Sequence, residues 1–343
     1  MKKVFLALTL IVGPVFVTSC SSGSLDEPEF KSSSALYQVT QPDAILSSVE
    51  FTESGNYVVV RNPIYLKDKQ DNTASNADET KQLPTLLLAS PWSQPVTRST
   101  TYNNIITGKY TKTGDTTYAL EGFGTVTVNA SGGNTYSLVI TETGSSTPYT
   151  LTAARKEQYK GSASTDKLCR TWRIAEMRLE VKVSGQEDGV SFNISVDEKV
   201  DGGDLAELMM NCYESLIRKM AAEYGGDVPE SEVEKALADV REEVKRTYPY
   251  VENMIFTQAG TYMVIYKGDM LAVSTWTWTD NDFKSIRYSW DYNNMEGAPS
   301  GECSVEFDGK KCYLVENSNV FGRFADEGYG SGNGKMTYTL EAE

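Results

Sequence analysis

The chain has 343 residues, with 32 Lys and Arg against 47 Asp and Glu, no histidine, and a formal net charge of −15. The negative charge excludes a broad nucleic-acid-binding surface and argues against extended contact with anionic lipid headgroups. The absence of histidine excludes Ser-His-Asp and Cys-His catalysis and the commonest transition-metal ligand. Few simple enzyme mechanisms remain, among them carboxylate-based glycoside hydrolysis, and cation sites made of oxygen ligands stay possible in principle. We therefore expect a non-catalytic protein and assign no catalytic residue, metal or cofactor.

Residues 1–20 have the features of a signal peptide. Lys2 and Lys3 precede an apolar run that is shorter than a membrane span. The run ends in Val17-Thr18-Ser19-Cys20, which resembles the lipobox of bacterial lipoproteins. This resemblance implies that the Cys20 thiol carries a diacylglycerol and becomes the first residue of the mature chain. Acyl chains on Cys20 would then attach the protein to a membrane.

Residues 21–34 are rich in Ser, Gly, Pro and acidic side chains, a composition that cannot bury enough apolar surface to fold. We expect a flexible tether. Ser21 occupies the position at which the inner-membrane retention signal of enteric bacteria has Asp, which favours the outer membrane. The Asp26-Glu27 pair resembles the surface-export signals of Bacteroidetes lipoproteins. The expected location is therefore the outer membrane, facing either the periplasm or the cell surface.

The rest of the chain contains short β segments separated by turn residues, and it contains an internal repeat. The pattern F-T-x-x-G-x-Y occurs at Phe51 to Tyr57 and again at Phe256 to Tyr262, and it predicts a hairpin in which Gly supplies the turn. A second echo joins Tyr149–Ala153 to Tyr338–Ala342. Because both patterns recur in the same order, we predict a duplicated fold. The expected units are a β domain at 35–156, a linker at 157–166, and a β domain at 167–343.

Residues 204–248 differ from their surroundings because their apolar positions follow helical spacing. Gly225-Gly226 interrupts the pattern and Pro229 marks a new start. The segment predicts a helical hairpin inserted into the second β domain. Two apolar stripes favour a cap on a barrel end or a filler of a groove, and the alternative is a lid or a docking element for a partner.

The second unit resembles the lipocalins, small antiparallel barrels that begin with a G-x-W strand and continue through an F-x-x-x-G-x-Y hairpin. Trp172 matches the tryptophan, whereas Arg170 stands in place of the glycine. In the first unit, Leu36-Tyr37-Gln38-Val39 is the nearest candidate for this strand. The resemblance implies a mainly β protein with two antiparallel lipocalin-like barrels or β-sandwiches, of a kind found in Bacteroidetes outer-membrane lipoproteins of unknown function.

Three tryptophans form the candidate ligand-binding residues: Trp276, Trp278 and Trp290. Trp276 and Trp278 alternate with threonines and therefore share one face of a strand. If this face points inward, the pair fills a core, which is the default. If it points outward, the three indoles make an exposed platform suited to sugar rings.

Four cysteines remain beside Cys20: Cys169, Cys212, Cys303 and Cys312. Two disulfides are conceivable. With Asp308-Gly309 as a two-residue turn, Val305 would face Cys312, and Cys303 would face Leu314. The two thiols would then lie about 7–8 Å apart on one face, too far for easy bridging. This register favours a free buried pair, although a three-residue turn would change it.

Two functions remain open for such a molecule. The first is a cell-envelope lipoprotein that binds a small apolar or glycan ligand through a barrel cavity or an aromatic patch. The second is a structural or assembly component of an outer-membrane complex that docks through the helical hairpin. Both have the membrane as a partner through the lipid on Cys20.

Overall fold

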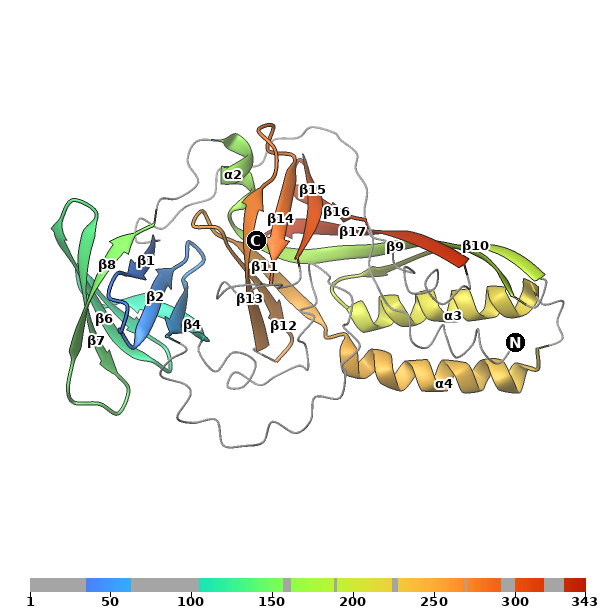
Figure 1. Ribbon diagram of the computed structural model, residues 1–343, viewed down its shortest axis with the longest axis horizontal. Coiled ribbons are helices and arrows are strands. Elements are labelled where there is room, and N and C mark those ends of the chain that lie inside the picture. The colour runs from blue at the N-terminus through green and yellow to red at the C-terminus, as the bar shows by residue number, and fades with distance from the viewer. Residues whose placement is uncertain are drawn as a thin grey trace.

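The computed structural model describes residues 35–62, 105–156, 162–187, 190–223, 228–268, 270–290, 300–317 and 330–343. The predicted signal peptide, Cys20 and the tether lie outside these residues. Most described residues belong to strands, and these strands build two antiparallel barrels (Figure 1). The mainly β fold class with two barrels and an inserted helical hairpin is therefore confirmed.

The first barrel has eight strands in up-and-down order. They are β1 (Ala35–Val39), β2 (Leu46–Phe51), β3 (Asn56–Arg61), β4 (Ile105–Lys112), β5 (Thr117–Leu120), β6 (Gly124–Gly132), β7 (Thr135–Glu142) and β8 (Tyr149–Arg155). Each strand pairs with its neighbour in sequence, and β1 also pairs with β8. This last pairing closes the sheet and removes its edges.

Aromatic rings fill much of the interior of the first barrel. Phe51 lies 4.4 Å from Tyr118 and 5.2 Å from Tyr110 between ring centroids. Tyr37 contacts Tyr136 edge to face at 5.1 Å. These rings alternate with outward-facing residues along their strands, as the pleat requires. The interior is therefore a packed aromatic core in the described residues.

The second barrel follows a short helix, α2 (Ala163–Leu168). Its strands are β9 (Thr171–Glu187), β11 (Val251–Phe256), β12 (Thr261–Tyr266), β13 (Met270–Trp278), β14 (Ser285–Ser289), β15 (Ser300–Asp308), β16 (Lys311–Glu316) and β17 (Gly330–Ala342). They also follow up-and-down order, and pairing of β9 with β17 closes the barrel. The two barrels therefore share one topology.

Strand β9 is long enough to belong both to the second barrel and to a sheet that extends beyond it. Its first residues pair with β11 inside the barrel, whereas residues from Glu176 onward pair on the same edge with β10 (Val190–Asp201). On its other edge, β9 pairs with β17 along most of its length. Beyond the barrel, β9, β10 and β17 thus form a three-stranded sheet, seen projecting to the right in Figure 1. We call this sheet and its two helices the arm.

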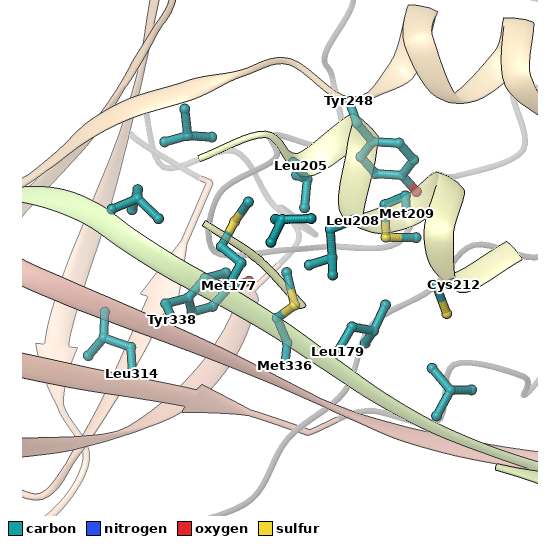
Figure 2. Close-up of a cluster of buried hydrophobic side chains, with 14 of the residues drawn as sticks. Met177, Leu179, Leu205, Leu208, Met209, Cys212, Tyr248, Leu314, Met336 and Tyr338 are labelled. Atoms are coloured by element: carbon teal, nitrogen blue, oxygen red, sulfur yellow. The ribbon is translucent and has the colours of Figure 1, made fainter. Parts of the chain in front are cut away.

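The predicted helical hairpin forms one side of the arm. It consists of α3 (Leu205–Glu223) and α4 (Glu230–Thr247). Leu208 of α3 is fully buried against the sheet, where Met177 of β9 and Met336 of β17 lie beneath it (Figure 2). These side chains belong to the same core as the interior of the second barrel. The hairpin therefore covers one face of the arm sheet, and the core beneath it is continuous with the core of the second barrel.

The repeated motif forms the expected hairpins, β2–β3 and β11–β12. Gly55 and Gly260 both have positive φ, 78° and 86°, which glycine adopts without strain. The motif threonine also has a role, since the Thr52 hydroxyl accepts a hydrogen bond from the Asn56 N–H, and Thr257 does the same for Thr261. The turn geometry thus explains why Thr and Gly recur together.

Equivalent positions of the two barrels make the same hydrogen bonds even where the residue type differs. The N–H of Tyr110 donates to Gly55 O, and the Tyr110 hydroxyl donates to Thr52 O at 3.1 Å. In the second barrel, the N–H of Trp276 donates to Gly260 O, and its indole N–H donates to the Thr257 carbonyl at 3.1 Å. Tyr110 and Trp276 therefore make the same contacts, which independently supports the internal repeat.

The two barrels contact each other through matching outer faces. Val58 and Val60 of β3 form one apolar cluster with Ile255, Met263 and Val273 of the second barrel. Val58 and Met263 occupy the same position of the repeated motif. Beside this cluster, Glu50 is 1% exposed, and its carboxylate accepts hydrogen bonds from the hydroxyl groups of two residues of the second barrel, Thr257 and Thr261.

The four cysteines of the described residues are free and buried, as the favoured interpretation of Cys303 and Cys312 expected. The predicted register was wrong, however, because the turn lies one residue later: Asp308 pairs with Lys311, and Phe307 pairs with Cys312. Cys303 faces Glu316 instead of Leu314. Gly309, with φ of 59°, is the first turn residue. The two thiols are consequently further apart along the barrel than expected.

Each described helix is too short or too polar to cross a membrane.

Candidate functional site

The three candidate tryptophans lie in or against the core of the second barrel. Trp276 is 2% exposed and Trp290 is 1% exposed. Trp276 contacts both Phe256 and Trp278 edge to face. Trp290 lies 5.9 Å from Tyr262 between ring centroids. Of the two geometries considered, the structure has the buried one, and the three indoles form no exposed platform.

Trp278 is partly buried and holds the short helix α2 against the barrel. Its indole N–H donates to the Thr165 hydroxyl at 3.0 Å. Trp172 also bonds to this helix, because its indole N–H donates to the Leu168 carbonyl at 2.9 Å. The indole groups at this end of the barrel therefore have structural hydrogen bonds with α2.

A buried polar cluster occupies a different part of the second barrel. Glu316, at the end of β16, is fully buried on the inward face that Leu314 and Cys312 share. The Cys303 thiol of the adjacent strand donates to Glu316 Oε1 at 3.4 Å. Together with three tyrosines, Tyr262, Tyr288 and Tyr338, these groups form what we call the inner carboxylate site.

The electrostatics of these tyrosines connect them to Glu316. Burial raises the pKa of Tyr288 and Tyr338 well above the ordinary value, and the nearby charge of Glu316 adds to the effect. The pKa of Tyr262 is also raised, mainly by burial and then by Tyr266 and Glu316. All three hydroxyl groups are therefore protonated near neutral pH, so each carries a hydrogen that it can donate.

The Tyr288 ring occupies the space beside a glycine on the next strand. Gly301 lies opposite Tyr288, and a Cβ at Gly301 would collide with the Tyr288 hydroxyl. Within the described residues, this buried hydroxyl oxygen has no hydrogen-bond partner. Because a buried polar group without a partner is costly, its presence in a packed barrel requires an explanation.

The first barrel contains the matching site. The repeated echo places Tyr149 where the second barrel has Tyr338, and these tyrosines pair with Ile140 and Leu314. Two residues further along the same faces are Glu142 and Glu316. The carboxylates therefore occupy equivalent positions in the two barrels.

The carboxylate of the first barrel has a resident cation. Arg61 donates to Glu142 Oε2 at 2.5 Å, and the Tyr149 hydroxyl donates to Glu142 Oε1 at 2.7 Å. Burial opposes the ionisation of Glu142, but the hydrogen bonds from Arg61 and Tyr149 and the positive charge of Arg61 hold its pKa below the ordinary value. The first barrel thus uses its own guanidinium to neutralise the carboxylate.

The second barrel has a tyrosine in place of that arginine. Arg61 and Tyr266 each lie four residues after the motif tyrosine, on the same inward face of the equivalent strand. Their pairing partners, Leu46 and Val251, are also equivalent. The two sites therefore share a carboxylate and a tyrosine, and Tyr266 occupies the position that Arg61 has in the first barrel.

The sequence alone did not reveal this site, since 47 acidic residues gave no reason to select Glu142 and Glu316. The sequence nevertheless contains a similarity between the two sites. Each glutamate ends a short segment of alternating apolar residues, Leu138–Glu142 in one barrel and Cys312–Glu316 in the other. Recognising them requires the pairing of each strand with the Tyr149 or Tyr338 strand.

Comparison with protein-family models and with curated proteins found no match to this chain.

Proposed function

We propose that this protein is a non-catalytic, lipid-anchored binding protein of the cell envelope whose second barrel holds a small ligand at the inner carboxylate site. The observation that carries the proposal is the Tyr288 hydroxyl, which is buried beside Glu316 and has no hydrogen-bond partner among the described residues. A ligand that hydrogen-bonds to Tyr288 would remove the cost of this group. Elsewhere, both barrels are packed with apolar and aromatic side chains.

The anchoring part of the proposal rests on the lipobox-like segment ending at Cys20 and on the polar tether that follows. The net charge of −15 supports attachment through acyl chains instead of a basic protein face. The proposed location is the outer membrane, with the barrels facing the periplasm or the cell surface.

Ligand binding can be tested on the mature chain with Cys20 replaced by Ser, which removes the lipid. Thermal shift with panels of amines, sugars, fatty acids and hydrophobic dyes identifies candidate ligands, and calorimetry measures their affinities. We expect Tyr288→Phe to weaken binding about tenfold, because one hydrogen bond to a buried group is lost. Tyr313→Phe is the matched control, since Tyr313 lies on the opposite face of β16. Equal effects of both variants would contradict the proposed site.

A second candidate function, docking in an envelope complex, is favoured by the arm. The sheet face opposite the helices carries cross-strand ion pairs: Arg178 with Asp197, Lys199 with Glu176, and Lys335 with Glu180. Such a charged face suits a polar protein surface more than a lipid.

Docking through the arm can be tested with a photo-crosslinking amino acid placed at Lys182 on the charged arm face or at Lys109 on the first barrel. Membranes from cells that express each variant are then irradiated. A discrete adduct from Lys182 alone would support docking, whereas adducts from both positions or from neither would count against it.

A further inference from the structure

The faces through which the two barrels contact each other are built from equivalent positions. Strand register makes the following residues equivalent: Glu50 and Ile255, Val58 and Met263, Val60 and Ile265. All of them lie on the outer surfaces of their barrels, where they alternate with inward core residues such as Tyr57 and Tyr262. They are nevertheless buried, apart from Ile265, which packs against their apolar cluster. Each barrel therefore offers the other the same part of its surface.

The same three strands of each barrel supply this surface, β2–β4 in the first and β11–β13 in the second. Val273 of β13 belongs to the apolar cluster, and Ile105 of β4 packs against it. Apolar patches of this kind on an outer surface mark sites of protein association. An interface that uses one surface patch on both partners is isologous, which is the type that joins two subunits about a twofold axis. The contact between the barrels has this property within one chain.

One position breaks the equivalence of the two faces. The first barrel has Glu50 where the second barrel has Ile255. The Glu50 carboxylate accepts hydrogen bonds from the Thr257 and Thr261 hydroxyls across the contact, at 2.9 and 2.5 Å. Both hydroxyl groups of the second barrel therefore use an acceptor that the first barrel supplies.

The first barrel satisfies the corresponding polar groups within its own turn. Thr52 and Asn56 take the positions of the two threonines, and the Thr52 hydroxyl donates to Asn56 O at 2.9 Å. The Asn56 amide donates to Ser54 Oγ, also at 2.9 Å. A twofold relation places Ile255 against this turn. Because the side-chain donors of the turn already have partners, it can accept an apolar neighbour.

We infer that the contact between the barrels is an isologous, dimer-type interface held within one chain, and that Glu50 restricts it to pairs of unlike barrels. Two first barrels paired in this way would place each Glu50 carboxylate against a turn whose side-chain donors are already used, and burying a charge without new donors is costly. Two second barrels would leave the Thr257 and Thr261 hydroxyls opposite Ile255, without an acceptor. The unlike pair satisfies both turns. This inference goes beyond the proposed ligand-binding function and does not depend on it.

The test uses the Cys20→Ser chain with a protease site between Lys156 and Ser162, so that cleavage cuts the connection between the barrels and retains both halves. Dilution and reconcentration allow the halves to exchange partners. Native mass spectrometry then distinguishes mixed pairs, pairs of first barrels and pairs of second barrels by mass, while fluorescence and circular dichroism verify folding. We expect mixed pairs of the parent in at least about tenfold excess over like pairs, because buried polar groups would lose their partners in a like pair.

Three variants examine the role of Glu50. Glu50→Ile gives the first barrel the residue of the second, so for additive contacts mixed pairs should fall to about half of the total, their statistical share. Glu50→Gln is the matched control, since its amide oxygen still accepts a hydrogen bond, and mixed pairs should continue to predominate. Thr261→Val acts from the other barrel, and it should produce pairs of second barrels but no pairs of first barrels.

Three results would overturn the selective role of Glu50: mixed pairs that persist in Glu50→Ile as in the parent, equal effects of Glu50→Ile and Glu50→Gln, or pairs of first barrels in Thr261→Val. If Glu50→Ile does not fold, the Thr261→Val result decides between the same alternatives. Halves of the cleaved parent that separate and do not pair would overturn the dimer-type interface itself, whatever ligand the intact protein binds.

Discussion

The contact between Glu50 and the second barrel permits a quantitative test of how the barrels are joined. We predict that Glu50 and Thr257 are energetically coupled. The Thr257 hydroxyl donates to Glu50 Oε1 at 2.9 Å, and the Thr261 hydroxyl donates to Oε2 at 2.5 Å. Both threonines are 1% exposed. The carboxylate therefore accepts both hydrogen bonds at a site that is almost completely shielded from solvent.

The size of the coupling follows from the type of bond. A hydrogen bond to a charged group contributes about 1.5–3 kcal/mol to stability. Glu50→Ala alone gives no clean value, because it also removes the cost of burying the carboxylate. A double-mutant cycle with Glu50→Ala and Thr257→Ala cancels that cost. We expect a coupling energy of about 1.5–3 kcal/mol, and a similar value for Glu50 with Thr261.

The assay is urea unfolding followed by two signals. The described tryptophans, Trp172, Trp276, Trp278 and Trp290, all lie in the second barrel, so fluorescence reports on that barrel once Trp92 is replaced by Phe. Far-UV circular dichroism reports on both barrels. We expect the two transitions to coincide in the parent chain and to separate in the double variant. A coupling energy below about 0.5 kcal/mol, the usual limit of additivity, would refute the reasoning.

Three further predictions concern other parts of the molecule. Leu208→Ala leaves a cavity between α3 and the arm sheet, and urea unfolding should show that the free energy of unfolding falls by about 2–5 kcal/mol. A decrease of less than about 1 kcal/mol would contradict the close packing of α3 on the sheet. Because the pKa of Glu142 is lowered in the folded state, its contribution is present above the ordinary carboxyl pKa of about 4.3 and disappears as the pH falls through the lowered value. Glu142→Gln should therefore reduce the melting temperature at pH 7 more than at pH 3, and equal reductions would count against the ion pair. Burial raises the pKa of the Cys212 thiol to about 12, so at pH 8 a thiol reagent should modify Cys212 only after unfolding, as peptide mass mapping can establish.

The parts of the fold that sequence could predict are those that local patterns determine. The Gly55 and Gly260 turns require positive φ, and the pattern around each glycine shows this directly. The helices α3 and α4 have apolar stripes at helical spacing, and their positions within 204–248 agree with the prediction. In such segments, each residue interacts mainly with its neighbours in sequence.

The parts that sequence could not predict depend on pairing between distant strands. The buried positions of β9 change from Trp172 and Ile174 to Met177 and Leu179 where its pairing with β17 shifts by one residue, and only the assembled sheet shows this shift and shows that β11 and β10 share one edge of the strand. The Cys303 register failed for a related reason, because Gly309 begins the turn one residue later than assumed. The two carboxylates became recognisable only when strand pairing placed Tyr149 near Glu142 and Tyr338 near Glu316.

The continuity of β9 and β17 through barrel and arm has a mechanical consequence. A load on the far end of the arm is carried by the hydrogen-bonded ladder of these two strands, with no loop between them and the barrel to absorb it. Leu179 pairs with Met336, which in turn pairs with Glu316. Force at the arm tip would therefore reach the barrel wall beside the carboxylate through paired strands, with the irregular pairing at Thr339 and Leu340 as the place where the ladder is weakest.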